Sequence, residues 1–258
     1  MTGWFDTHCH VHDERTPGGA DGAVAEANEA GVSDMITVGC DRATSLAALD
    51  VAAKHQRVYA TVGLHPHEAR HGVESIADLL RPDGERPDPI AVGECGLDYY
   101  YDHSPRDVQR EAFAAQIDLA NGLGLPLVIH TRDAWEDTFD ILDGQGVPER
   151  VVFHCFTGGI DQAAECLARG AYLSMSGIVT FKSATDVRAA AAMCPAERLL
   201  VETDSPYLAP VPNRGKVNRP AWVPHVGACL AEIRGTSVDE IRLSTAASAR
   251  LVFGVTTS

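Results

Sequence analysis

Eight short apolar runs alternate with alanine-rich segments along most of this chain. Nearly all of the runs are apolar throughout rather than at every second position, which is typical of parallel strands covered on both faces. The intervening segments carry apolar residues at spacings of three or four, as amphipathic helices do. The predicted strands are residues 4–8, 35–39, 58–63, 90–94, 127–130, 151–154, 172–176 and 199–204.

The number of strand–helix units predicts the fold class. Eight such units in 258 residues match a (β/α)8 TIM barrel, an α/β fold that typically takes about 250 residues. We therefore expect a single domain over residues 1–258, with its functional residues at the carboxyl ends of the strands. A doubly wound open sheet is the main alternative, but no glycine-rich phosphate loop follows the first run.

Two segments carry clear helix signals. The sequence Ser104-Pro105-Arg106-Asp107 predicts a capping box with proline at the first helical position. Residues 237–253 predict a final amphipathic helix. The apolar side chains expected on or near one side of it are Val238, Ile241, Leu243, Ala247, Leu251 and Val252.

Composition and charge narrow the class of protein. Hydrophobic residues make up 45% of the chain and charged residues 22%, as in a soluble globular protein. No apolar run approaches the roughly 18 residues needed to cross a bilayer, and the first residues lack the features of a signal peptide, so we expect a cytoplasmic protein. Acidic residues outnumber basic ones 36 to 21, which argues against broad binding to nucleic-acid backbones. A phosphate substrate remains compatible with this charge, because divalent ions reverse the local field in a pocket.

Potential metal ligands stand at the ends of five of the apolar runs. His8 and His10 are two residues apart in the first run, so their side chains share one face of a strand. Because the carboxyl ends of parallel strands lie at one face of a barrel, the ligands should converge on one cavity and suffice for two metal ions. The other four candidates are Glu94, His130, His154 and Asp204.

The ligand types indicate which chemistry such a site would perform. Four histidine nitrogens with two carboxylates form a ligand set that suits Zn, Mn, Fe, Co or Ni, whereas Mg and Ca are usually bound by oxygen atoms alone. Two ions roughly 3.5–4 Å apart need a bridging carboxylate, and Glu94 is the natural candidate. A shared water would be acidified towards a pKa of about 7 and become a nucleophile, with Asp204 to orient or deprotonate it. The alternative role for Asp204 is to cap the following helix.

Other residues near predicted strand ends are candidates for binding substrate. His65 and His67 follow the third run, and Arg132 should share the face of His130. An arginine beside a metal pair would complement a phosphate, although a surface ion pair is the alternative for each arginine. Further candidates in the proline-rich segment 208–224 are Arg214, Lys216, Asn218 and Arg219.

Seven stretches of this sequence, taken together, resemble the TatD-type metal-dependent DNases, a branch of the amidohydrolase-like barrels. They are FDTHCH (5–10), GLHP (63–66), VGECGLDY (92–99), IHTRDA (129–134), HCFTG (154–158), VETDSPYL (201–208) and RGKVNRP (214–220). They span nearly the whole chain, and as a set they are specific.

The resemblance implies phosphodiester hydrolysis, typically as a 3′→5′ exonuclease on single-stranded DNA and sometimes on RNA, supported by Mg²⁺ or a similar divalent ion. Fold and metal site transfer within such a family better than substrate does. At matching positions the resemblance implies two metal ions. The ligands of one would be His8, His10, Glu94 and Asp204, and those of the second would be Glu94, His130 and His154. It also implies that His65 and Arg132 face the substrate.

Three hypotheses about function follow. The first is a two-metal phosphodiesterase that uses Mg, Mn or Zn and acts on DNA ends, with Glu94 and Asp204 as catalytic residues and no obligatory protein partner. Its expected substrate-binding residues are His65, Arg132, Arg214 and Asn218.

The second hypothesis is a hydrolase of a lactone, an amide or another small-molecule ester. Related barrels often bridge their metals with a modified lysine, whereas here Glu94 takes that place, which favours the first hypothesis. The third hypothesis, a non-catalytic metal-binding scaffold, needs closed coordination shells, and the chain offers too few additional ligands to close two of them.

Overall fold

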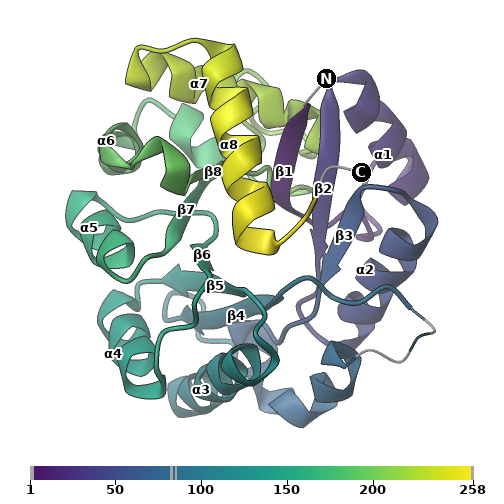
Figure 1. The fold of residues 1–258 in the computed structure, drawn as a ribbon, viewed down its shortest axis with the longest axis vertical. Helices are drawn as coiled ribbons and strands as arrows, with labels where there is room; N and C mark the ends of the chain where they lie inside the picture. Colours follow the sequence, from purple (N-terminus) through teal and green to yellow (C-terminus); the bar gives the residue numbers. More distant parts are fainter. Residues whose placement is uncertain (1–2, 82–83, 85, 257–258) are drawn as a thin grey trace. The chain divides into compact units, whose positions relative to one another are not determined.

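Eight strands and eight α-helices follow one another along residues 3–81, 84 and 86–256, the part of the chain that the computed structural model describes (Figure 1). The strands are β1 (Trp4–Cys9), β2 (Val32–Val38), β3 (Val58–Thr61), β4 (Val92–Asp98), β5 (Leu127–Arg132), β6 (Val151–Phe153), β7 (Tyr172–Met175) and β8 (Leu199–Val201). The helices are α1 (Gly19–Glu29), α2 (Arg42–Lys54), α3 (Arg106–Leu123), α4 (Trp135–Gln145), α5 (Ile160–Ala168), α6 (Thr185–Met193), α7 (Val223–Arg234) and α8 (Val238–Phe253). Each predicted strand is present, and between β3 and β4 short 3-10 turns take the place of an α-helix.

Contacts between residues divide the chain into two compact units. The first unit is Met1–Thr37 with His154–Ser258, and the second is Val38–Phe153. The single domain expected over residues 1–258 stays a prediction. That range includes residues 1–2, 82–83, 85 and 257–258, which lie outside the described residues.

The first unit joins the first and last strands of the chain. Within it, β1 pairs with β2 and β7 pairs with β8, both in parallel, and β1 lies beside β8. The hydroxyl of Thr7 in β1 donates to the carbonyl oxygen of Val201 in β8 at 3.0 Å. Beyond β8, the Asp204 N–H donates to the carbonyl oxygen of His8 at 2.8 Å. The carboxyl ends of β1 and β8 therefore meet.

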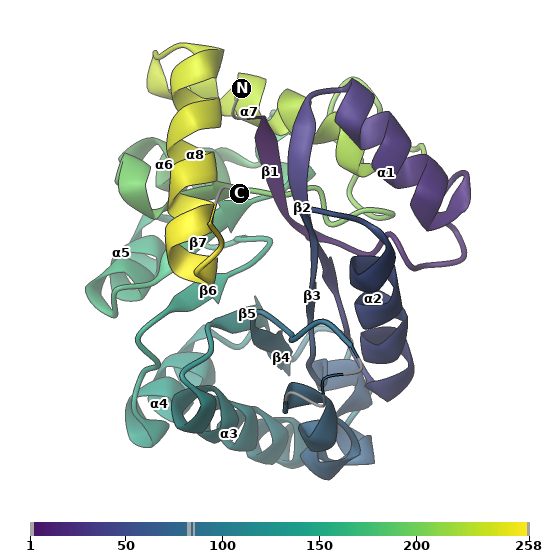
Figure 2. The same cartoon turned by 45° about the vertical axis from the view of Figure 1, so that its right-hand side comes forward.

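Two helices cover these strands of the first unit. Helix α8 packs against β1 and β8, and α7 packs against α8 (Figures 1 and 2). Ser237 caps α8 with a capping box to Glu240, so the predicted final helix is confirmed. Its predicted apolar side is only partly right, because Ile241 and Val252 are buried whereas Leu243 and the other large members are exposed. Small residues such as Ala246 and Ala249 occupy the buried side, where the helix lies close to the strands.

The second unit holds four neighbouring parallel strands. Strand β3 lies beside β4, and β4, β5 and β6 pair in order. Helix α3 packs on β4, and two buried glutamines of α3 hydrogen-bond the backbone, one within β4 and the other after β3. Gln109 bonds both backbone groups of Asp98, with its oxygen 2.8 Å from the N–H and its nitrogen 3.2 Å from the carbonyl. Gln116 does the same for Leu64, at 2.8 and 3.0 Å, and thereby positions the next residue, His65.

The strand ends differ from the prediction at the ligand positions. Glu94 is the third residue of β4 rather than its last, because the strand continues to Asp98. Strand β8 ends at Val201, three residues before Asp204. Backbone pairing continues through glycine and polar residues, as the pairing of Asp98 with Arg132 shows, since ladder hydrogen bonds do not require apolar side chains.

The predicted capping box at the start of α3 is wrong. Pro105 is the residue before the helix, which begins at Arg106 without a side-chain cap. Ser104 is buried, and its hydroxyl donates to the carbonyl oxygen of His67 at 2.8 Å. The serine therefore ties the start of α3 to the segment after β3.

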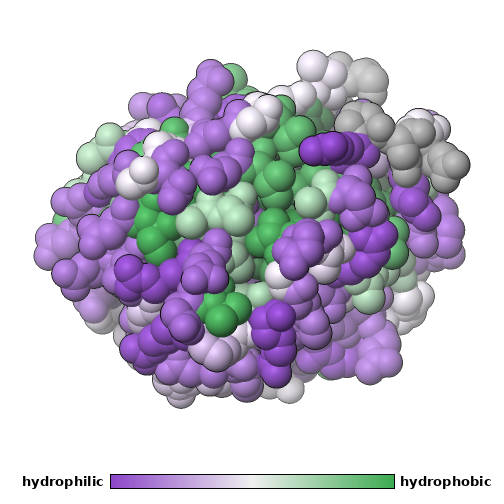
Figure 3. Space-filling view, turned by 90° about the horizontal axis from the view of Figure 1, so that it is seen from below, coloured by the Kyte–Doolittle hydropathy of each residue, from purple (hydrophilic) through white to green (hydrophobic). Residues whose placement is uncertain are grey.

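Hydrophilic side chains cover most of the face drawn in Figure 3, with smaller groups of hydrophobic side chains between them. In the described part of the chain, no helix has both the length and the apolar character needed to cross a membrane.

Replacing Gly96 by alanine tests the close approach of β4 and β5. A Cβ at Gly96 would overlap the carbonyl oxygen of His130, and its φ of +133° disfavours any side chain. Gly96→Ala should lower the midpoint of thermal unfolding by about 5–10 °C, because overlap and strain together cost about 2–3 kcal/mol. Gly122→Ala on α3 is the matched control, since a Cβ there meets nothing within 4 Å. Equal midpoints for the two variants would show that β4 and β5 are less closely packed.

Candidate functional site

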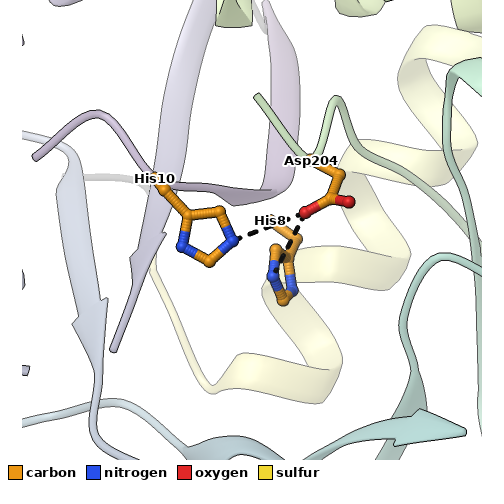
Figure 4. Close-up of side chains that lie close together, drawn as sticks. All are labelled: His8, His10 and Asp204. Carbon is orange, nitrogen blue, oxygen red and sulfur yellow. Dashed lines mark ion pairs between the residues drawn. The ribbon is translucent and has the colours of Figure 1, made fainter. Parts of the chain in front are cut away.

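A cluster of two histidines and an aspartate lies where β1 and β8 end (Figure 4). His8 is buried in β1, and His10 follows the strand. The Nε2 atoms of these rings lie 3.8 Å and 3.4 Å from Oδ1 of Asp204. Burial alone would raise the pKa of Asp204, but its hydrogen bond with His10 and the nearby imidazoles lower it below the ordinary value. The cluster therefore presents an ionised carboxylate beside two ring nitrogens.

His154 joins this cluster through a stack of imidazole rings. Its ring lies on that of His8, with centroids 3.9 Å apart and an interplanar angle of 15°. Its Nδ1 atom is 3.3 Å from Oε1 of Glu202, which also accepts the Cys155 N–H at 2.7 Å. A carboxylate at Nδ1 leaves Nε2 as the nitrogen that a metal would take, which is how metal-binding histidines are commonly oriented.

Glu202 indicates that a cation belongs here. The residue is fully buried, and in the residues that the structure describes its Oε2 atom has no hydrogen-bond partner. One of its carboxylate oxygens lies within 4.8 Å of ring nitrogens of His8 and His154. Burying a carboxylate is costly unless a positive charge or a full set of donors accompanies it. The donor set and the under-satisfied carboxylate both fit a divalent metal ion.

The turn that carries Asp204 is held from two sides. The Asp6 carboxyl accepts the Thr203 N–H at 2.8 Å and its hydroxyl at 2.6 Å. Burial raises the pKa of Asp6 to about 8. The amide of Asn218 donates to the carbonyl oxygen of Thr203 at 2.8 Å and to that of Tyr207 at 2.6 Å. These contacts hold Asp204 at a φ of 56°, a left-handed conformation that aspartate tolerates better than most residues.

A second cluster, in the second unit, is centred on Glu94. Its Oε1 atom lies 3.0 Å from Nδ1 of His130 and 3.4 Å from Nε2 of His65. The three residues form a second group whose ligand atoms are close enough to share an ion. Glu94 is buried, whereas the two imidazoles are partly accessible.

Asp98 orients His130 from the opposite side of the ring. Its Oδ2 atom is 3.2 Å from Nε2 of His130 and 3.0 Å from Nε2 of His67. Burial opposes ionisation of Asp98, but hydrogen bonds from these imidazoles and from the Tyr101 N–H hold its pKa well below the usual range. With Nε2 engaged by Asp98, the Nδ1 atom that faces Glu94 is the one available to a metal.

His65 has one ring nitrogen engaged by the backbone and the other facing Glu94. Its Nδ1 accepts the N–H of His67 at 3.1 Å. Burial lowers its pKa to about 4, so the ring is neutral near pH 7 and carries its proton on Nε2. That N–H points at Glu94, whose Oε1 is 3.4 Å away. This tautomer suits the substrate-side role expected for His65, which stays a prediction.

The remaining predicted substrate residues have defined surroundings. The Arg132 guanidinium lies over Tyr100 at 3.9 Å from the ring centroid, and that of Arg214 lies 4.0 Å from the centroid of Phe181. Asn218 is buried, and its amide holds the Asp204 turn as described above. The substrate-binding roles of these three residues stay predictions, as does convergence of all six predicted ligands on one cavity with Glu94 as the bridge.

Sequence reasoning missed the two orienting carboxylates. Glu202 precedes Asp204 by two residues, and Asp98 follows Glu94 by four. Even spacing from a ligand in an extended segment is the signal that could have found both, because such residues share a face. Glu202 was read as part of the eighth run, which was taken to end at Asp204, and Asp98 lies beyond the predicted end of the fourth run at Glu94.

Residues 5–254 match the family profile described as TatD related DNase. The chain belongs to this family. An uncharacterized metal-dependent hydrolase of Bacillus subtilis, YabD, is 38% identical over 97% of this chain and 99% of its own length. The 3′-5′ ssDNA/RNA exonuclease TatD of Erwinia amylovora is 36% identical over 97% of this chain and 100% of its own length.

The solved structures agree with the family assignment. The crystal structure of YJJV, a TatD homologue from Escherichia coli, superposes with a TM-score of 0.90 at 28% identity and covers 98% of each chain. The α/β fold of this TatD-family hydrolase matches TatD and amidohydrolase TIM-barrel structures, as the repeated strand–helix units predict. It is a metal-dependent hydrolase whose buried histidine and carboxylate clusters suit metal ions.

Substituting Glu202 by glutamine tests whether this carboxylate supports a metal in the TatD-family hydrolase. Glu202→Gln keeps the shape but removes the charge behind His154, so metal affinity should fall roughly 10–100-fold. Titration calorimetry with Mn²⁺ and with Zn²⁺ measures the change. The control is Glu165→Gln, which alters an exposed pair with Arg169 on α5 and should leave affinity unchanged. If Glu202→Gln binds metal as tightly as the wild type, Glu202 does not orient a ligand.

Proposed function

We propose that this chain hydrolyses phosphodiester bonds of single-stranded DNA, and of RNA, from the 3′ end with the help of Mg, Mn or Zn ions. The observation that carries the proposal is the pair of histidine–carboxylate clusters in which a second, buried carboxylate fixes the metal-facing nitrogen of a histidine. The relatives named as 3′-5′ ssDNA/RNA exonucleases support the choice of substrate.

The clusters supply the metal ligands of this proposal. Divalent ions, when bound, supply Lewis acidity and lower the pKa of a coordinated water towards about 7. We assign as ligands, in the first unit, His8, His10, His154 and Asp204, and in the second unit, Glu94 and His130.

The protein groups move protons and balance charge. Asp204 is ionised and can orient the attacking water or accept its proton, and Glu94 offers a second carboxylate for the same chemistry. The Nε2–H of His65, which faces Glu94 in this structure, can instead donate a hydrogen bond to a phosphate oxygen of the substrate. The Arg132 guanidinium offsets the charge that builds up on the phosphate in the transition state.

Hydrolysis of a lactone or amide is the competing function within the fold. Barrels with that chemistry often bridge their metals with a modified lysine. The lysines of this chain are Lys54, Lys182 and Lys216, and they lie at the end of α2 and in two loops rather than in either cluster. This placement favours a phosphodiester substrate.

An assay on end-labelled single-stranded DNA tests the proposal. The wild type should shorten the strand from its 3′ end with Mg²⁺, Mn²⁺ or Zn²⁺ and stop when a chelator is added. Asp204→Asn and Glu94→Gln should each lose activity by about 10²–10⁴-fold while remaining folded, since Asn tolerates the backbone of Asp204. Asp239→Asn, at an exposed position on α8, is the control and should remain active. Turnover of a lactone or amide panel without any cleavage of DNA or RNA would favour the competing function.

The net charge of −15 leads to a second prediction about DNA ends. Because phosphate contacts need many cationic side chains, binding to a covalently closed duplex should be at least about tenfold weaker than binding to a short single strand. Competition against a fluorescent oligonucleotide, followed by anisotropy, compares the two. Equal affinities would mean that the protein binds along the DNA backbone rather than at ends.

A further inference from the structure

Two neighbouring tyrosines are exposed directly after β4. The side chain of Tyr100 is 58% exposed and that of Tyr101 is 50% exposed. Large aromatic side chains favour burial, and a contiguous exposed group of them commonly marks a binding surface. The proposed function has not used either residue.

A cation joins the two rings into one surface. The Arg132 guanidinium lies 3.9 Å from the centroid of Tyr100 and 4.8 Å from that of Tyr101. The tyrosine rings are 4.8 Å apart and nearly perpendicular, at 88°, while His103 lies parallel to Tyr101 at 5.6 Å. Ring faces and a guanidinium plane, which are the surfaces on which nucleobases stack, are thus gathered at one place.

The surface is tied to the Glu94 cluster within the same unit. Oδ1 of Asp98 accepts the N–H groups of Tyr100 at 3.0 Å and Tyr101 at 2.9 Å. The other oxygen of this carboxylate holds His130 and His67, and the ring of Tyr101 lies 5.5 Å from that of His67. A single carboxylate therefore sets the positions of both the metal-facing histidine and the two tyrosines.

We infer that Tyr100, Tyr101 and Arg132 form a stacking surface for the unpaired bases at the end of a single-stranded nucleic acid. The inference rests on the proposed function and names the residues that select single strands. In an unpaired strand the bases can turn their faces onto aromatic rings, whereas in a duplex neighbouring bases cover those faces. Stacking also gives an acidic protein a source of affinity that does not depend on many phosphate contacts.

Kinetics on two matched strands test the surface. One strand is an ordinary oligodeoxynucleotide, and the other has abasic sites at its three 3′-terminal positions. Tyr100→Ala and Tyr101→Ala should each raise KM for the ordinary strand about tenfold with little change in kcat, and should leave KM for the abasic strand unchanged. Tyr100→Phe and Tyr101→Phe keep the rings and should retain the wild-type KM.

Leu123→Ala is the control for loss of an exposed apolar side chain of the same unit. Leu123 is 39% exposed and lies at the carboxyl end of α3, whereas the tyrosines lie just before its amino end. Unchanged KM in both alanine variants, or an equal rise for the ordinary and abasic strands, would overturn the stacking surface.

A measurement of oligonucleotide binding without cleavage distinguishes failure of this inference from failure of the proposed function. Anisotropy of a labelled thymidine oligonucleotide is measured with wild type and variants in the presence of chelator, where no cleavage occurs. Weaker binding by the alanine variants supports the surface even if the wild type cleaves no strand, in which case only the proposed reaction is wrong. Absence of wild-type binding, or equal binding by all variants, refutes the surface even if the enzyme is an active nuclease.

Discussion

Each cluster of this protein depends on a buried carboxylate that accepts a hydrogen bond from one ring nitrogen of a histidine and leaves the other nitrogen for a metal. Glu202 holds His154, and Asp98 holds His130. Both carboxylates are almost fully buried, where negative charge is costly unless donors or a cation accompany it. Asp98 accepts hydrogen bonds from two imidazoles and two backbone N–H groups, whereas Oε2 of Glu202 has no hydrogen-bond partner among the described residues, and a divalent cation at the histidines would offset its charge. The strands, the glutamines of α3 and the Asp204 turn all serve to keep these carboxylate–histidine pairs in place.

Strand existence was predictable from sequence, whereas strand ends were not. Continuous apolar runs report burial on both faces, and burial is what all eight predicted strands share. Backbone pairing obeys a different rule, because glycine and charged residues can extend a ladder once neighbouring strands are in place. Strand β4 thus runs past Glu94 to Asp98 and brings a second carboxylate onto the same side. Likewise, the buried side of α8 carries alanines while larger apolar residues are exposed, because the helix packs closely on the strands and small side chains allow that approach.

The residues of the two clusters could be singled out from the sequence because histidines and acids at successive strand ends form a pattern along the chain, and their role as metal ligands stays a proposal. The residues that orient them could not be singled out in this way, because their roles rest on contacts between segments distant in sequence, such as Glu202 with His154. The tautomer of His65 likewise follows from one backbone N–H of a neighbouring residue. The run of tyrosines after β4 does not by itself say which of its side chains are exposed. Their exposure and their shared arginine are evident only in three dimensions.

The join between the first and last strands has a consequence for how the protein is made. The Thr7 hydroxyl bonds a carbonyl group 194 residues further along the chain, in the same unit as the His8–Asp204 cluster. The other unit is one continuous segment, so it can begin to fold on the ribosome as soon as that segment has emerged. The N-terminal strand β1 can pair with β2 early, but it meets β8 only after nearly 200 further residues have been synthesised. His8 and His10, on and just after that strand, are therefore made early, but their contact with Asp204 forms only after β8 has been synthesised.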